Sequence, residues 1–152
     1  MVYRTNYTHP GFGEVTIASD GQNIVGLWMA GQKHFGGTVD GEMEPADDLP
    51  IGDLRQRVWR KLAEIPYGQV RTYGDLAREI AQEDGKEKMS SQAVGGAVGH
   101  NPISVIIPCH RVVGANGSLT GYAGGLARKI WLLEHEGVDM EGLFVPEKGT
   151  AL

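Results

Sequence analysis

The stretch TYGDLAREIAQEDGKEKMSSQAVGGAVGHNP, residues 72–102, decides how the chain folds. Thr72, followed three positions later by Asp75, forms a capping-box pattern that predicts the start of a helix. After the polar segment EDGKEK, either Ser90 or Ser91 is placed to cap a second helix, which the following Asn-Pro pair ends. Two short helices joined by a polar turn predict a helix-turn-helix arrangement.

Apolar residues at helical spacing predict two more helices, one on each side of this pair. The first begins near Leu54 with Asp53 as its cap, and the last covers Leu126–Glu136 and is closed by Gly137. The β-branched run Ile103–Ile107 lies between them and predicts a strand or extended segment.

The front of the chain has a different pattern. Two β-prone runs, Val15–Ala18 and Ile24–Met29, flank an Asp-Gly pair and predict a β-hairpin. A segment rich in glycine, proline and acidic residues follows and is typical of a linker. We therefore expect an α+β fold, with a reduced N-terminal β domain and linker at residues 1–50 and a mainly helical C-terminal domain at residues 51–152.

The composition is that of an ordinary globular protein. The chain has 152 residues, of which 41% are hydrophobic and 22% charged. No apolar run approaches the roughly 20 residues of a membrane span, and the N-terminus lacks the apolar segment of a signal peptide. The single cysteine excludes an internal disulfide and a cysteine-rich zinc site, and it favours a reducing, cytoplasmic compartment.

Charge is distributed unevenly along the chain. Up to Asp53 there are two basic and eight acidic residues, a net charge of −6, whereas Leu54–Trp131 holds eleven basic and six acidic residues, a net charge of +5. Such asymmetry is expected where one part of a protein contacts nucleic-acid phosphate. An ordinary solvated surface accounts for the charges equally well.

Cys109, the only cysteine, lies in the stretch ISVIIPCHRVVG. A free cysteine is more often a small buried apolar residue than a nucleophile. Pro108 places the thiol at a chain turn, however, and the neighbouring His110 and Arg111 favour the reactive thiolate. A nucleophile also needs a base and a group that orients the base, and the acidic residues of LLEHEG, Glu134 and Glu136, are both candidates for that group.

The helix after the polar turn is rich in small residues. Its sequence AVGGAVG lets a backbone approach closely, either that of a neighbouring helix or that of a nucleic acid. Gln92, just inside the start of this helix, can hydrogen-bond to base edges.

Five segments in this order resemble the O6-alkylguanine-DNA alkyltransferases, also called methylated-DNA–protein-cysteine methyltransferases. They are PYGQVRTYGDLA, SSQAVGGAVGHNP, IIPCHRVVG, LTGYAGGLARK and LLEHEG. The resemblance covers roughly Leu54–Gly137, and its most specific part is PCHRV followed by GYAGG.

The resemblance implies a role for individual residues. Cys109 matches the alkyl acceptor, and His110 matches the histidine that takes its proton through a water. Glu136 rather than Glu134 matches the carboxylate that orients the histidine. Asn101 and Tyr73 match the brace of the active-site turn and a donor to the guanine ring, and Val112, Tyr122 and Ala123 match the wall of the base pocket. The DNA-binding residues implied are Thr72, Ser91, Gln92, Ala93, Gly95, Gly96, Ala97 and Arg111.

The activity implied is DNA repair by one irreversible transfer of an alkyl group from O6-alkylguanine to Cys109, with O4-alkylthymine as a further candidate substrate. The flipped-out base would be reached from the minor groove of double-stranded DNA. The resemblance also implies a winged helix-turn-helix-like motif, a remnant of a ribonuclease H-like N-terminal domain, a monomer, and no metal or cofactor.

The chain departs from the family pattern in three places. Gln92 stands where an arginine usually fills the gap left by the flipped base, and the loop before it is longer. The front domain is shorter. Two other functions remain as alternatives: a non-enzymatic sensor of alkylated DNA of the alkyltransferase-like type, which lacks the cysteine, and a cysteine hydrolase that uses Cys109 and His110.

Overall fold

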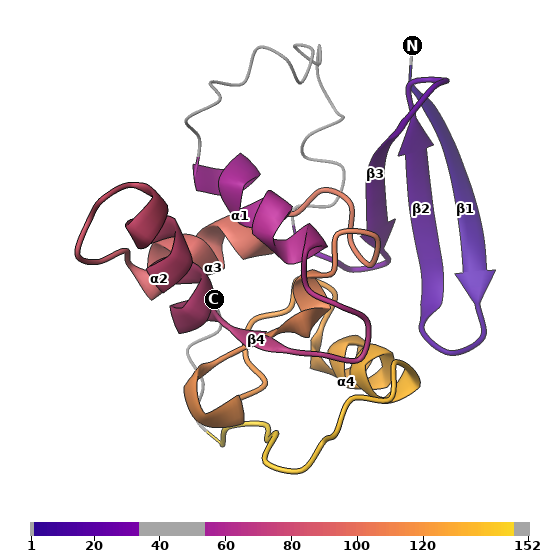
Figure 1. Ribbon diagram of the computed structural model, residues 1–152. Coiled ribbons are helices and arrows are strands. Elements are labelled where there is room, and N and C mark those ends of the chain that lie inside the picture. Colours follow the sequence, from indigo (N-terminus) through magenta and orange to yellow (C-terminus); the bar gives the residue numbers. More distant parts are fainter. Residues whose placement is uncertain (1, 34–53, 148–152) are drawn as a thin grey trace.

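The computed structural model describes residues 2–33 and 54–147. A small antiparallel sheet stands to one side of a group of helices (Figure 1). The elements in chain order are β1 (Tyr3–His9), β2 (Gly13–Ser19), β3 (Ile24–Met29), α1 (Leu54–Ala63), β4 (Arg71–Thr72), α2 (Tyr73–Glu83), α3 (Ser91–Gly99), the short 3-10 helix η2 (Cys109–Arg111), β5 (Val112–Val113), a second 3-10 turn η3 (Ala115–Gly117) and α4 (Leu126–His135).

The predicted hairpin is present as β2 and β3, which pair antiparallel. Asp20 shapes its turn by accepting hydrogen bonds from the backbone N–H groups of Gln22 and Asn23. β1 adds a third strand that the sequence analysis did not predict. Its side chains are almost all exposed, so β1 lacks the alternation of apolar and polar residues that identifies a half-buried strand.

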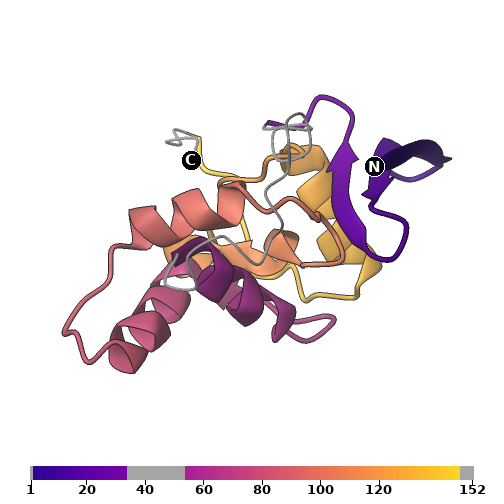
Figure 2. The ribbon, with the colours of Figure 1, turned by 90° about the horizontal axis from the view of Figure 1, so that it is seen from above.

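One face of the sheet packs on α4. Val15 and Met29, opposite each other in the β2–β3 register, form a buried cluster with Leu132. Phe12 and Trp131 border this cluster, with ring centroids 5.3 Å apart. α4 therefore lies between the sheet and the other helices (Figure 2).

The three helices α1, α2 and α3 share the main core. Apolar residues from each of them, with Cys109 and Val112 from the segment that follows, form one buried cluster. Its helical members are Val58, Leu62, Tyr73, Leu76, Ala77, Ile80, Val94, Ala97 and Val98. The turn that carries Cys109 is thus built directly on the helical core, so packing of these helices positions it.

The predicted helix starts are present where the structure describes them. Thr72 Oγ1 accepts from the N–H of Asp75, and Asp75 accepts from the N–H of Thr72, which is the reciprocal capping box. Ser90, rather than Ser91, caps α3 by accepting from the N–H of Ala93. The predicted cap of α1, Asp53, lies outside the described residues.

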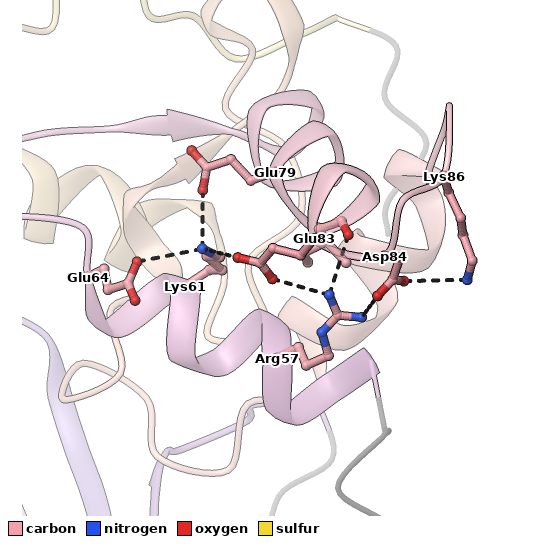
Figure 3. A network of polar contacts seen from close by, with 8 residues as sticks. Arg57, Lys61, Glu64, Glu79, Glu83, Asp84 and Lys86 are labelled. Carbon is pink, nitrogen blue, oxygen red and sulfur yellow. Dashed lines mark hydrogen bonds and ion pairs between the residues drawn. The ribbon is translucent and has the colours of Figure 1, made fainter.

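Ion pairs join α1 to α2 (Figure 3). Arg57 contacts Glu83 and Asp84, and Lys61 lies 2.6 Å from Glu83 and 3.8 Å from Glu79. These contacts neutralise part of the positive charge that the sequence places in this region. Arg71, Arg78, Lys86 and Arg111 are ion-paired as well.

The run Ile103–Ile107 is not a continuous strand, so the strand alternative of the prediction was wrong. Val105 has φ of 73°, which bends the chain back on itself, and Ile106 is exposed. The segment pairs instead with the edge of the front sheet, because Leu27 N–H donates to Pro102 and Ser104 N–H donates to Leu27. The apolar run is therefore a folded turn tied to β3.

A parallel pair of two-residue strands, β4 and β5, links the start of α2 to the residues after Cys109. α4 follows η3 and ends as predicted, with Glu136 at its C-cap and Gly137 at φ of 73°. In the described part of the chain, no helix has the length and apolar character needed to cross a membrane.

Candidate active site

Cys109 begins the short 3-10 helix η2, directly after Pro108, and its side chain is buried at 4% exposure. Asn101 braces the turn that carries it. The Asn101 side chain donates to the carbonyl of Ile107 at 2.7 Å and accepts from the N–H of Ile103 at 3.0 Å. The Asn101 side chain therefore holds the backbone before the thiol at two points, Ile103 and Ile107.

His110 follows Cys109 and is completely buried. Its Nε2 lies 2.6 Å from Glu136 Oε1. Arg111 contacts both oxygens of the same carboxylate, through Nε at 2.8 Å and Nη2 at 2.9 Å, and donates to the carbonyl of Ile65. Helix α4 supplies the carboxylate at its C-cap, so its packing brings Glu136 to residues that lie far away in the sequence.

Burial and hydrogen bonding set the protonation of this group. Burial raises the pKa of the Glu136 carboxyl, but hydrogen bonds from Arg111 and His110 outweigh it, and the pKa lies below the ordinary value. Burial lowers the pKa of His110 despite the neighbouring carboxylate. A neutral histidine beside an ionised glutamate therefore carries its proton on Nε2 and leaves Nδ1 as an acceptor. Nδ1 is buried and has no hydrogen-bond partner among the described residues.

Burial raises the pKa of the Cys109 thiol, although hydrogen bonding with Asn101 and the charge of Lys129 act in the opposite direction. The resting thiol is thus mainly protonated at neutral pH. It needs a base to become a nucleophile, and His110 is the adjacent group with a suitable protonation state.

Lys129 belongs to this site, and the sequence analysis did not identify it. Its side chain is fully buried, and its ammonium donates to the carbonyls of Val112 and Thr120 at 2.6 and 3.0 Å. Burial lowers its pKa to about 8, against the opposing influence of Cys109. A signal was available: Lys129 lies three residues after Leu126, on the apolar stripe of the predicted helix, where a charged residue needs a specific partner.

Two tyrosines stand beside the thiol. Burial raises the pKa of Tyr73 well above its ordinary value, so its hydroxyl remains a donor, and it donates to the carbonyl of Gly121 at 3.1 Å. The hydroxyl of Tyr122 contacts the sulfur of Met29 at 3.9 Å, and its ring lies edge-on to His110. The loop that holds Gly121 and Tyr122 therefore borders the group around Cys109.

The residues for which the family resemblance implies DNA binding fall into two groups. Most lie beside cavities near α3, and two face the interior. Two cavities lie beside α3. One, of about 330 Å³, is lined by Thr72, Tyr73, Gly74, Arg78, Ser91, Gln92, Gly114, Ala115 and Thr120. The other, of about 120 Å³, is lined by Lys33, Gly95, Gly96, Gly99, His100, Gly121 and Ala123. Thr72, Ser91 and Gln92 thus line the larger cavity, and Gly95 and Gly96 line the smaller one. Ala93, in the same helix, is exposed.

Two of these residues have a different environment. Ala97 is only 3% exposed and packs in the helical core, and its carbonyl accepts from the indole N–H of Trp59. Arg111 is held by Glu136 and the Ile65 carbonyl. Both residues face the interior because α3 must bury one side against α1, and because an ionised glutamate needs a cationic partner.

Comparison with known proteins gives consistent matches. The family described as "6-O-methylguanine DNA methyltransferase, DNA binding domain" matches residues 53–138. The methylated-DNA--protein-cysteine methyltransferase of Mycobacterium tuberculosis is 42% identical over 147 residues, which covers 82% of this chain and 86% of that protein. The protein of the same name from Salmonella typhimurium is 42% identical over 133 residues, covering 87% and 72%.

The structural match extends over most of both chains. The crystal structure of Mycobacterium tuberculosis OGT in complex with DNA superimposes with a TM-score of 0.69 at 39% identity, covering 88% of this chain and 91% of that one. The mixed α/β architecture with its small antiparallel sheet is therefore shared. From the sequence and structural matches together, the chain belongs to the 6-O-methylguanine DNA methyltransferase family.

Proposed function

We propose that this protein repairs DNA by transferring the alkyl group of O6-alkylguanine to Cys109 in a single, irreversible turnover. The observation that carries the proposal is the state of His110: Nε2 is held by Glu136, while the buried Nδ1 remains an acceptor with no partner among the described residues. A buried base on the residue next to a protonated thiol supplies what nucleophilic transfer by cysteine requires.

In the proposed reaction, His110 Nδ1 takes the thiol proton of Cys109 through a bridging water. The thiolate attacks the alkyl carbon on O6, the sulfur–carbon bond forms, and the carbon–oxygen bond breaks. Its electron pair leaves with the guanine. Glu136 stabilises the imidazolium that develops, in the way a carboxylate supports a histidine base in other catalytic triads. The thioether product does not readily hydrolyse, so each protein molecule acts once.

Guanine is a poor leaving group because it departs with negative charge. Tyr73, which stays protonated, can donate a hydrogen bond to the ring as that charge develops. Its present acceptor, the carbonyl of Gly121, belongs to the loop that carries Tyr122 and Ala123. These two residues, with Val112 of β5, are the proposed wall of the base pocket. If the bound base replaced that carbonyl as the acceptor, the Tyr73 hydroxyl would donate its hydrogen bond to the substrate.

We propose double-stranded DNA as the partner, read by a winged helix-turn-helix-like motif in which α3 approaches the minor groove. The exposed start of α3 supports this, as do the small residues Gly95 and Gly96 beside an open cavity. Because the target carbon is inside the duplex, the nucleotide must be flipped out. Gln92 is proposed to fill the gap that remains, and O4-alkylthymine is a second candidate substrate.

We further propose that residues 1–50 are a reduced, ribonuclease H-like domain and residues 51–152 the DNA-binding and alkyl-transfer domain. The main helical core, which contains no residue of the front sheet, supports this division, although the sheet also packs on α4 through Val15, Met29 and Leu132. A monomer in the cytoplasm is the simplest setting for such a reagent.

Intact-mass measurement after mixing with a duplex that contains O6-methylguanine tests the function. We expect each protein molecule to gain the mass of one methyl group, and Cys109→Ala to abolish the gain. Tight binding without a gain would instead identify a sensor of alkylated DNA. Repeated turnover on ester or amide substrates would identify a hydrolase.

A further inference from the structure

We propose that Lys33, four residues after the end of β3, binds a backbone phosphate of the DNA next to the flipped nucleotide. The inference rests on the proposed function and adds a contact from the N-terminal unit to it. The family resemblance assigned no role to this residue, because it covers only Leu54–Gly137.

The backbone holds Lys33 at the site. Its N–H donates to the carbonyl of Ala123 at 3.2 Å, in the loop proposed as the pocket wall. The preceding residue, Gln32, is buried, and its side-chain oxygen accepts from Ser104 at 3.2 Å and from the N–H of Met29 at 3.0 Å. Ser104 in turn forms a bridge with Ile107, whose carbonyl accepts from the N–H of Cys109 at 2.8 Å. The start of the Lys33 side chain is thus fixed relative to the reactive group.

The cavity beside Lys33 suits a nucleic-acid backbone. Besides Lys33 and His100, its wall is formed by Gly95, Gly96 and Gly99 of α3 and by the loop residues Gly121 and Ala123, so most of the wall is backbone. A Cβ atom added at Gly96 or Gly99 would meet nothing within 4 Å. There is therefore room on this side of α3 for a partner to approach closely. Lys33 lines the same cavity.

The charge of Lys33 is available to a partner. Its side chain is exposed, and among the described residues it forms no ion pair. Most basic side chains of α1 and α2 contact carboxylates instead, as do Arg71 and Arg111. Lysine binds phosphate as a compact point charge, and its contribution is lost on neutralisation. The front unit, acidic as a whole, thus places one of its two basic residues at the site.

Salt dependence of binding measures this contact directly. Each neutralised phosphate contributes about 0.9 to the slope of log K against log salt concentration. In a Cys109→Ser background, which stops the reaction, we expect Lys33→Ala to reduce the slope for a duplex by about 0.9 and Lys33→Arg to retain it. Arg60→Ala, which removes one exposed positive charge on α1, is the matched control and should leave the slope nearly unchanged.

With Cys109 intact, Lys33→Ala should slow methyl transfer from duplex DNA several-fold at subsaturating concentration. An unchanged slope in Lys33→Ala, or an equal change in Arg60→Ala, would overturn the proposal, because the effect would then be absent or would reflect overall charge only. The slope on undamaged duplex is informative even if the wild type transfers no methyl group. Failure of the proposed reaction is therefore distinguishable from failure of the Lys33 contact.

Discussion

The Nε2 atom of His110 lies 2.6 Å from Oε1 of Glu136, although the two residues are 26 positions apart in the sequence. Arg111 donates to both oxygens of the same carboxylate. This arrangement keeps the glutamate ionised, orients the imidazole and leaves Nδ1 as the acceptor. A histidine adjacent to the nucleophile in the chain can therefore act through a water rather than by direct contact.

The pH dependence of transfer tests His110 as the base. Its pKa is lowered by burial, so the imidazole is neutral above about pH 6.5 and the wild-type single-turnover rate should be flat from there to about pH 8.5. In His110→Gln only the small thiolate fraction reacts, since burial raises the pKa of Cys109. We expect a loss of about 100-fold or more at pH 7.5. The rate should then rise about tenfold per pH unit, and a flat profile in the variant would exclude the role.

Replacement of Glu136 by Gln should reduce both stability and transfer, because Arg111 and His110 lose their buried partner. We expect the free energy of unfolding to fall by about 3 kcal/mol. The folded-state pKa of Glu136 is below its unfolded value, so its contribution is present above about pH 4.5 and is lost as the pH falls through the folded pKa. Urea denaturation at several pH values measures this. Glu134→Gln, an exposed position two residues earlier, is the control and should change little.

Lys129→Met should destabilise the protein by about 2 kcal/mol at neutral pH, because the carbonyls of Val112 and Thr120 lose their donor. The pKa of Lys129 is about 8 in the folded state and about 10.4 when unfolded, so between these values the unfolded chain binds more protons. The wild type should therefore gain stability relative to the variant as pH rises from 8 to 10. A difference that does not depend on pH, with exposed Lys88→Met as reference, would contradict the buried position.

Gln92 is predicted to fill the space left by the flipped nucleotide. Gln92→Ala should reduce the transfer rate on duplex DNA about tenfold, equivalent to about 1.4 kcal/mol, whereas Gln92→Arg should retain or increase it. The control is Gln82→Ala, at an exposed position on α2. Unchanged DNA affinity and transfer rate in Gln92→Ala would show that this side chain has no such role.

Local chemistry made much of the fold predictable. Several of these features act through backbone groups only a few positions away, so their effects can be read from short sequence patterns. They are the capping residues Thr72 and Ser90, the turn at Asp20, and Gly137, which follows α4. The thiol and its neighbouring histidine were also identifiable, because Cys109 and His110 are adjacent in the sequence. The run Ile103–Ile107 misled the prediction, because β propensity describes a pleated, half-buried surface and this run instead folds into a turn.

By itself, the sequence determined which segments form helices and which segment carries the thiol. Its pattern left Glu134 and Glu136 equivalent, and only the packing of α4 decides which carboxylate reaches His110. The burial of Lys129 and the direction of Arg111 toward the interior are likewise tertiary outcomes. The physical reason is that hydrogen bonds and ion pairs between distant residues exist only once the helices and the sheet have packed, and burial then sets the pKa values on which the proposed reaction depends.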